Sequence, residues 1–125
     1  MATSILVLAD DIFFLAKIQE TAKAVGVAVA RFNGQGGPAA LAEINPQGVI
    51  LDLNRRGSTS AVEWIRALKS EPATARTRIV AFASHVDEDL IAAAQAAGCD
   101  AVMARSAFSR RLPEILRELA APVTG

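Results

Sequence analysis

Three carboxylates are placed where they could act together, namely Asp52 and the adjacent pair Asp10 and Asp11. Asp52 interrupts the apolar stretch GVILDLN, which runs from Gly48 to Asn54 and is followed by a turn-like Arg-Arg-Gly. A short apolar run bounded by turn residues predicts a strand buried on both faces, as in a parallel sheet. Asp52 would then lie at the carboxyl end of a central strand, where open α/β sheets bind ligands. An ionised carboxylate in such a place needs a metal ion, a cation or hydrogen bonds as compensation.

The segments that must position these carboxylates alternate between strand-like and helix-like patterns. Strands are predicted at residues 4–9, 27–32, 48–53, 78–83 and 101–104. Helices are predicted at 12–25, with the Asp10-Asp11 pair as turn and N-cap, in a short segment ending at 44, and at 60–70, 87–97 and 109–120. In the first helix, Ile12, Leu15, Ile18 and Ala22 recur at helical spacing and should face the core.

Five strands alternating with five helices predict a doubly wound parallel sheet with the flavodoxin-like strand order 2-1-3-4-5. This order places the ends of the first and third strands side by side, which brings Asp10 and Asp11 next to Asp52. Ser84 and Arg105 follow the fourth and fifth strands, so they should border the same crevice. Because no linker or internal repeat interrupts the pattern, we expect residues 1–125 to form a single domain.

The amino-acid composition argues against nucleic-acid and membrane partners. The chain has 125 residues, 52% of them hydrophobic, and its 13 basic residues balance 13 acidic ones. This balance gives no electrostatic attraction to nucleic acid or membrane surfaces. The single cysteine, Cys99, cannot form an internal disulfide, and no secretory signal or membrane-length apolar run is present. We therefore expect a soluble cytoplasmic protein with no nucleic-acid or membrane partner.

Four strings at matching places in this pattern, LVLADD, VILDLN, IVAFASH and GCDAVMARSAF, resemble the receiver domains of bacterial two-component response regulators. The resemblance implies that Asp52 accepts a phosphoryl group. It also implies a weak Mg²⁺ site formed by Asp10, Asp52 and the backbone carbonyl of Asn54, with Asp11 assisting. Ser84 and Arg105 would contact the phosphoryl oxygens.

The sequence also departs from the family pattern. Ala9 takes the usual place of the first acid, and Arg105 replaces a lysine. Ala83 takes the place of a hydroxyl residue, so that Ser84 would have to serve with a shift of one residue. Val102 takes the place of an aromatic residue that moves on phosphorylation. We therefore expect weak coupling between phosphorylation and the surface formed by the fourth helix, fifth strand and fifth helix.

The resemblance implies a stand-alone signalling protein in a phosphorelay, and not an enzyme. Its partners would be a histidine kinase or phosphotransfer protein and a downstream protein target. The resemblance also allows a homodimer formed through the surface of the fourth helix, fifth strand and fifth helix. The alternative is a pseudo-receiver, an interaction module that works without phosphorylation. A flavodoxin-like ligand-binding protein or enzyme is less favoured, because the sequence has no evident pair of nucleophile and base and no phosphate-binding loop.

Overall fold

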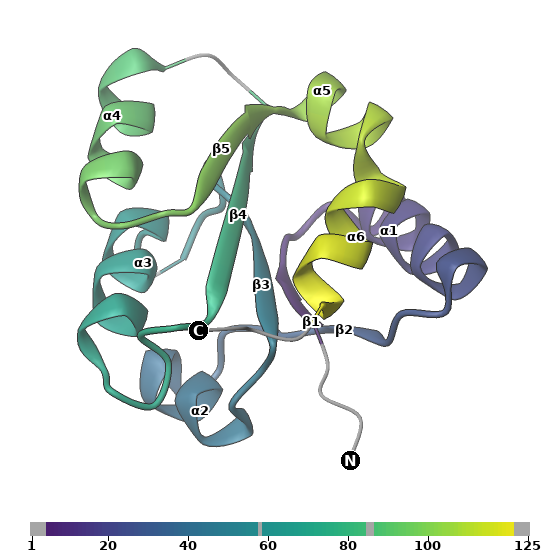
Figure 1. The fold of residues 1–125 in the computed structure, drawn as a ribbon. Helices are drawn as coiled ribbons and strands as arrows, with labels where there is room; N and C mark the ends of the chain where they lie inside the picture. Colours follow the sequence, from purple (N-terminus) through teal and green to yellow (C-terminus); the bar gives the residue numbers. More distant parts are fainter. Residues whose placement is uncertain (1–4, 58, 85–86, 122–125) are drawn as a thin grey trace.

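A five-stranded parallel sheet forms the centre of the molecule (Figure 1). The computed structural model describes residues 5–57, 59–84 and 87–121. The strands are β1 (Ile5–Leu8), β2 (Val29–Arg31), β3 (Gly48–Asp52), β4 (Arg78–Ala83) and β5 (Ala101–Ala104). Their order is β2-β1-β3-β4-β5, which confirms the predicted topology. In this order β3 pairs with β1 on one side and β4 on the other, so Asp52 ends the central strand.

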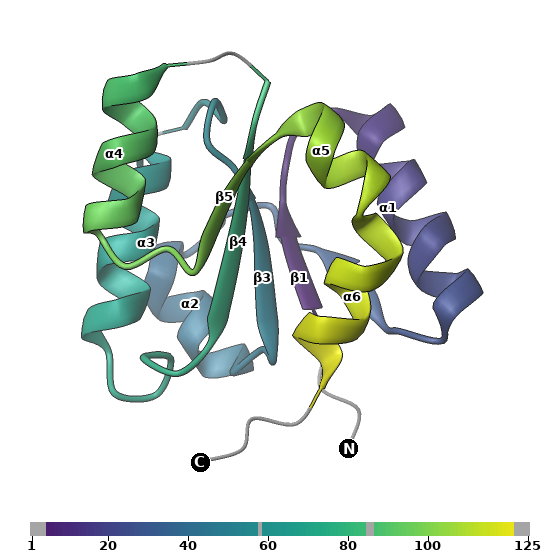
Figure 2. The same ribbon diagram turned by 45° about the horizontal axis from the view of Figure 1, so that its top comes forward.

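Helices cover both faces of the sheet, as Figures 1 and 2 show. One face is covered by α1 (Ile12–Val25), α5 (Arg105–Arg110) and α6 (Leu112–Ala120). The other is covered by α2 (Gly37–Ile44), α3 (Ala61–Ser70) and α4 (Glu88–Ala96). The cores beneath them are separate layers: Val7, Ile50 and Phe82 face the first group, whereas Leu8, Leu51 and Ala81 face the second. No helix among these residues is long and apolar enough to cross a membrane.

The last helical region differs from the prediction of one helix starting near Ser109. Helix begins at Arg105, directly after β5, and is divided at Arg111 into α5 and α6 (Figure 2). Pro113 lies near the start of α6, where a missing N–H costs little, whereas inside a continuous helix its ring would clash with the preceding turn. The earlier start matters for the site, because it puts Arg105 and Phe108 on the same short helix.

Two smaller predictions also need correction. The second strand is shorter than residues 27–32, because the N–H of Val27 donates to the carbonyl of Ala22 at the end of α1 and not to a neighbouring strand. Ile12 is 66% exposed, and Phe14 joins Leu15, Ile18 and Ala22 on the buried face in its place. The predicted strand residue Ser4 lies outside the described residues.

Candidate functional site

Asp52 is half-buried at the carboxyl end of β3. Its Oδ1 accepts a hydrogen bond of 2.9 Å from the backbone N–H of Asn54. Burial raises the pKa of Asp52; the charges of Asp10 and Asp11 add to this rise, while the Asn54 N–H and Arg105 oppose it. Asp10 and Asp11 thus lie near enough to Asp52 for their charges to affect its pKa.

Asp11 has two structural roles. Its Oδ1 accepts hydrogen bonds from the N–H groups of Phe13 and Phe14, at 3.0 and 3.1 Å, so within the predicted Asp10-Asp11 pair it is Asp11 that caps α1. Its Oδ2 accepts a hydrogen bond of 2.7 Å from Nη2 of Arg105. This bond, followed by the helix N–H groups, lowers the pKa of Asp11. Both oxygens of Asp11 are therefore already engaged.

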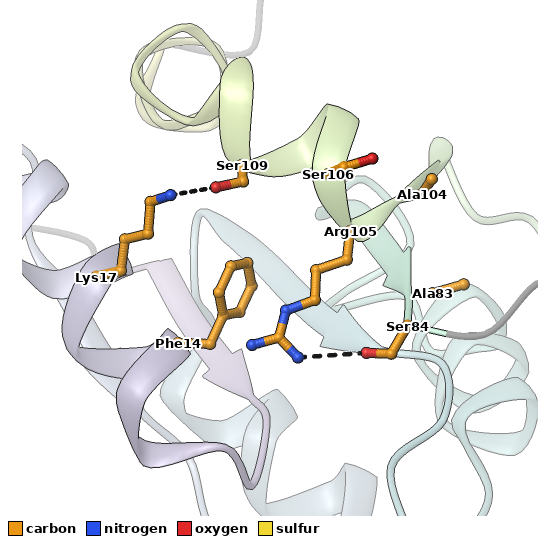
Figure 3. A pocket seen from close by; sticks show the side chains of 8 residues that line it. All are labelled: Phe14, Lys17, Ala83, Ser84, Ala104, Arg105, Ser106 and Ser109. Carbon is orange, nitrogen blue, oxygen red and sulfur yellow. Dashed lines mark hydrogen bonds between the residues drawn. The ribbon is translucent and has the colours of Figure 1, made fainter.

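Arg105 links the ends of three strands. Besides its bond to Asp11, its guanidinium carbon lies 4.1 Å from the centre of the Phe14 ring, a cation–π contact. Its Nη1 is 3.5 Å from Oγ of Ser84 (Figure 3). Ser84 is held in turn, because its N–H donates to Oδ1 of Asn54 at 2.8 Å. The predicted phosphoryl-contacting residues, Ser84 and Arg105, are therefore neighbours at this edge.

The platform beneath Arg105 is an aromatic cluster that the sequence did not reveal as part of the site. Phe14 is 6% exposed, and its ring packs edge-on against Phe82 at 4.9 Å between ring centres. Phe108 lies 5.8 Å from Phe14 and 5.1 Å from Phe82. Because Phe108 belongs to the turn of helix that starts at Arg105, the unexpected extent of α5 contributes to this cluster.

Asp10 is compensated by two other arginines. Its Oδ1 lies 3.9 Å from Nη2 of Arg31 and 4.0 Å from Nε of Arg55. The side chain of Arg55 is only 10% exposed, and its Nη2 donates to the carbonyl of Asn33 at 3.3 Å. Neither arginine was singled out as a site residue from the sequence, although the Arg-Arg pair after Asp52 stood out in the turn.

Comparison with solved structures finds response regulators that are similar to this chain over nearly its whole length. A response regulator from Burkholderia multivorans is 25% identical, with 100% of each chain covered and a TM-score of 0.76. A response regulator from Hahella chejuensis is 21% identical over 94% of this chain and 95% of that one, with a TM-score of 0.81. The Mn²⁺-bound form of response regulator Rcp1 is 20% identical over 98% and 97%, with a TM-score of 0.78.

The chain has the fold of a response-regulator receiver domain. No protein-family model and no curated protein matches its sequence. The likeness to receivers therefore rests on the fold.

The residues at the crevice between the ends of β1 and β3 suit a divalent cation only in part. Within residues 5–57, 59–84 and 87–121, no three His, Cys, Asp or Glu side chains gather closely enough to hold a metal ion. Asp10 and Asp52 nevertheless supply carboxylate oxygens, the ligands that Mg²⁺ takes one or two at a time while keeping several waters. Asp11 would take part only through water, because both its oxygens are engaged. The donor set thus fits a weak site and not a closed metal cage.

Proposed function

We propose that this chain is a cytoplasmic receiver-type signalling protein that accepts a phosphoryl group on Asp52 and acts through contacts with other proteins. The observation that carries the proposal is the half-buried carboxylate at the end of the central strand, near enough to Arg105 for that charge to act on its pKa, with Ser84 next to Arg105. The phosphoryl group would come from a histidine kinase or phosphotransfer protein, and a downstream protein would bind the modified form. The chain would be a signalling module and not an enzyme.

In the proposed transfer, an oxygen of ionised Asp52 attacks the phosphorus of the donor. A P–O bond to Asp52 forms, and the donor leaves with the electrons of its own bond to phosphorus. The acyl phosphate adds negative charge where Asp10 and Asp11 already raise the pKa of Asp52. The guanidinium of Arg105 can donate hydrogen bonds to the phosphoryl oxygens. The hydroxyl of Ser84 lies next to this guanidinium and would donate a further hydrogen bond. Mg²⁺ on Asp10, Asp52 and the Asn54 carbonyl would supply further charge neutralisation.

A pseudo-receiver is the second candidate, and the arginines favour it. Arg31 and Arg55 lie beside Asp10, and Arg105 pairs with Asp11. Guanidinium groups therefore already supply positive charge at the place where a receiver would need a divalent cation. In this form the crevice would be a structural feature, and the protein would bind partners without phosphorylation.

Mass spectrometry after incubation with acetyl phosphate and Mg²⁺ separates the two candidates. The proposal expects the wild type to gain one phosphoryl mass and Asp52→Asn to gain none. A parallel titration with Mg²⁺ should shift the backbone amides of Asp10 and Asp52 in the NMR spectrum. If the wild type stays unmodified and no amide shifts at millimolar Mg²⁺, the phosphorylation proposal fails and the pseudo-receiver stands.

A further inference from the structure

A cavity of about 630 Å³ opens beside the crevice, between the first turns of α1 and the start of α5 (Figure 3). It is lined by Phe14, Lys17, Ala83, Ser84, Ala104, Arg105, Ser106 and Ser109. Cavities of roughly 300–1,000 Å³ are typical of small-molecule sites. The phosphorylation chemistry proposed for Asp52 uses only Arg105 and Ser84 from this lining, so Lys17, Ser106 and Ser109 have no role in it.

The lining is cationic. Lys17 and Arg105 contribute positive charges, and none of the lining residues is acidic. The ammonium of Lys17 donates to Oγ of Ser109, which uses one of its three N–H groups. Arg105 gives one hydrogen bond to Asp11 and has five N–H donors in all. Both cations therefore have donors left for a ligand, and the hydroxyls of the lining serines add further hydrogen-bonding groups.

The lining also has an apolar part. Phe14 contributes its ring. Ala83 and Ala104, which are paired at the ends of β4 and β5, border the cavity, but the Ala83 side chain is buried in the core on the other face of the sheet. Figure 3 shows the ring of Phe14 between the side chains of Lys17 and Arg105. A ligand that fills this space would place its charged group near the two cations and a nonpolar group against the Phe14 ring.

We propose that this cavity binds a small organic phosphate monoester, noncovalently and without a divalent cation. Two cations and several hydroxyls suit a phosphate, which carries about two charges and three acceptor oxygens, better than a carboxylate, which one guanidinium can satisfy. The site shares Arg105 and Ser84 with the proposed phosphorylation, but it does not require Asp52 or a metal ion.

The test is an NMR titration of the full chain with phenyl phosphate in the presence of EDTA. Saturable shifts are expected at the amides of Lys17, Ala104, Ser106 and Ser109, with tighter binding than for inorganic phosphate or benzoate. Lys17→Gln should weaken binding by roughly fivefold, the upper range for one exposed charge pair. Lys23→Gln is the matched control, because Lys23 is exposed in the last turn of the same helix, away from the cavity.

Asp52→Asn separates this site from the phosphoacceptor, since binding should persist in that variant. Failure of acetyl phosphate to modify Asp52 would leave the expected titration unchanged. The inference is overturned by the absence of saturable shifts, by benzoate or inorganic phosphate binding as tightly as phenyl phosphate, by equal effects of Lys17→Gln and Lys23→Gln, or by loss of binding in Asp52→Asn.

Discussion

Gly34 and Arg55 form a close contact whose removal gives a sharp test of the structure. Gly34 has a backbone φ of +85°, and a Cβ added there would lie 2.5 Å from Nη2 of Arg55. An alanine at position 34 must therefore displace the guanidinium, which donates to Asn33 and lies beside Asp10. Gly37 is the matched control: its φ is +70°, but nothing lies within 4 Å of the corresponding Cβ position.

The expected losses in the free energy of unfolding follow from the left-handed backbone at both positions and from the contact with Arg55 at position 34 alone. A left-handed backbone at a residue with a side chain costs about 1–2 kcal/mol, and this should be the whole effect of Gly37→Ala. Gly34→Ala should lose in addition the hydrogen bond from Arg55 to Asn33, a net contribution of about 0.5–1.5 kcal/mol. The free energy of unfolding should therefore fall by about 1–2 kcal/mol in Gly37→Ala and by about 1.5–3.5 kcal/mol in Gly34→Ala.

Urea denaturation of both variants, in the wild-type and Arg55→Met backgrounds, measures these costs. Methionine removes the guanidinium that the new methyl group meets, so the gap between the two variants should shrink to less than about 0.5 kcal/mol. Unchanged m-values would show that the effect lies in stability and not in the denatured state. The reasoning is refuted if Gly34→Ala costs no more than Gly37→Ala, or if the gap persists when Arg55 is methionine.

Three further predictions concern the crevice and its supports. Burial raises the pKa of Asp52 above its ordinary value of 3.8, so its ionised form opposes folding at neutral pH. Asp52→Asn should therefore raise the free energy of unfolding at pH 7, and this gain should disappear in melts below pH 3.8. An unchanged or lower stability at pH 7 would contradict this. Ser60→Ala should cost about 1 kcal/mol in urea titrations, because Ser60 and Glu63 cap α3 reciprocally; a loss too small to measure would mean that the cap contributes little. With a beryllofluoride phosphoryl mimic, amide shifts should stay near the crevice in the wild type and reach α4, β5, α5 and α6 only in Ala83→Thr, Val102→Tyr. Extensive shifts in the wild type would show that Ala83 and Val102 do not block the coupling.

The sheet could be predicted because its signals are local. Apolar runs such as GVILD define a strand buried on both faces, and the alternation of strands and helices leaves few possible orders. The cap at Asp11 is local too, since its hydrogen bonds reach only two and three residues ahead. These local signals place Asp52 at the end of the third strand, and Asp10 and Asp11 after the first strand, as in the structure.

The partners of those carboxylates could not be predicted, because they come from distant parts of the chain. Arg105 is 94 residues from Asp11, and the bond from Arg55 to Asn33 spans 22 residues. Which arginine reaches which carboxylate depends on loop conformation and on Phe14, whose role as a platform is set by aromatic packing from β4 and α5. The start of α5 was missed for a related reason: RSAFSR shows one buried residue, Phe108, and no repeating apolar face.

Arg55 and Arg105 together reach the segments that follow all five strands. Arg55, which follows β3, contacts Asn33 after β2 and lies beside Asp10 after β1. Arg105, which follows β5, contacts Asp11 after β1 and Ser84 after β4. Loops linked in this way have lost much of their conformational entropy before anything binds, so a ligand or partner at this edge has less disorder to remove. The same links set a cost on rearrangement, because any movement that opens one loop must first break a guanidinium contact to another.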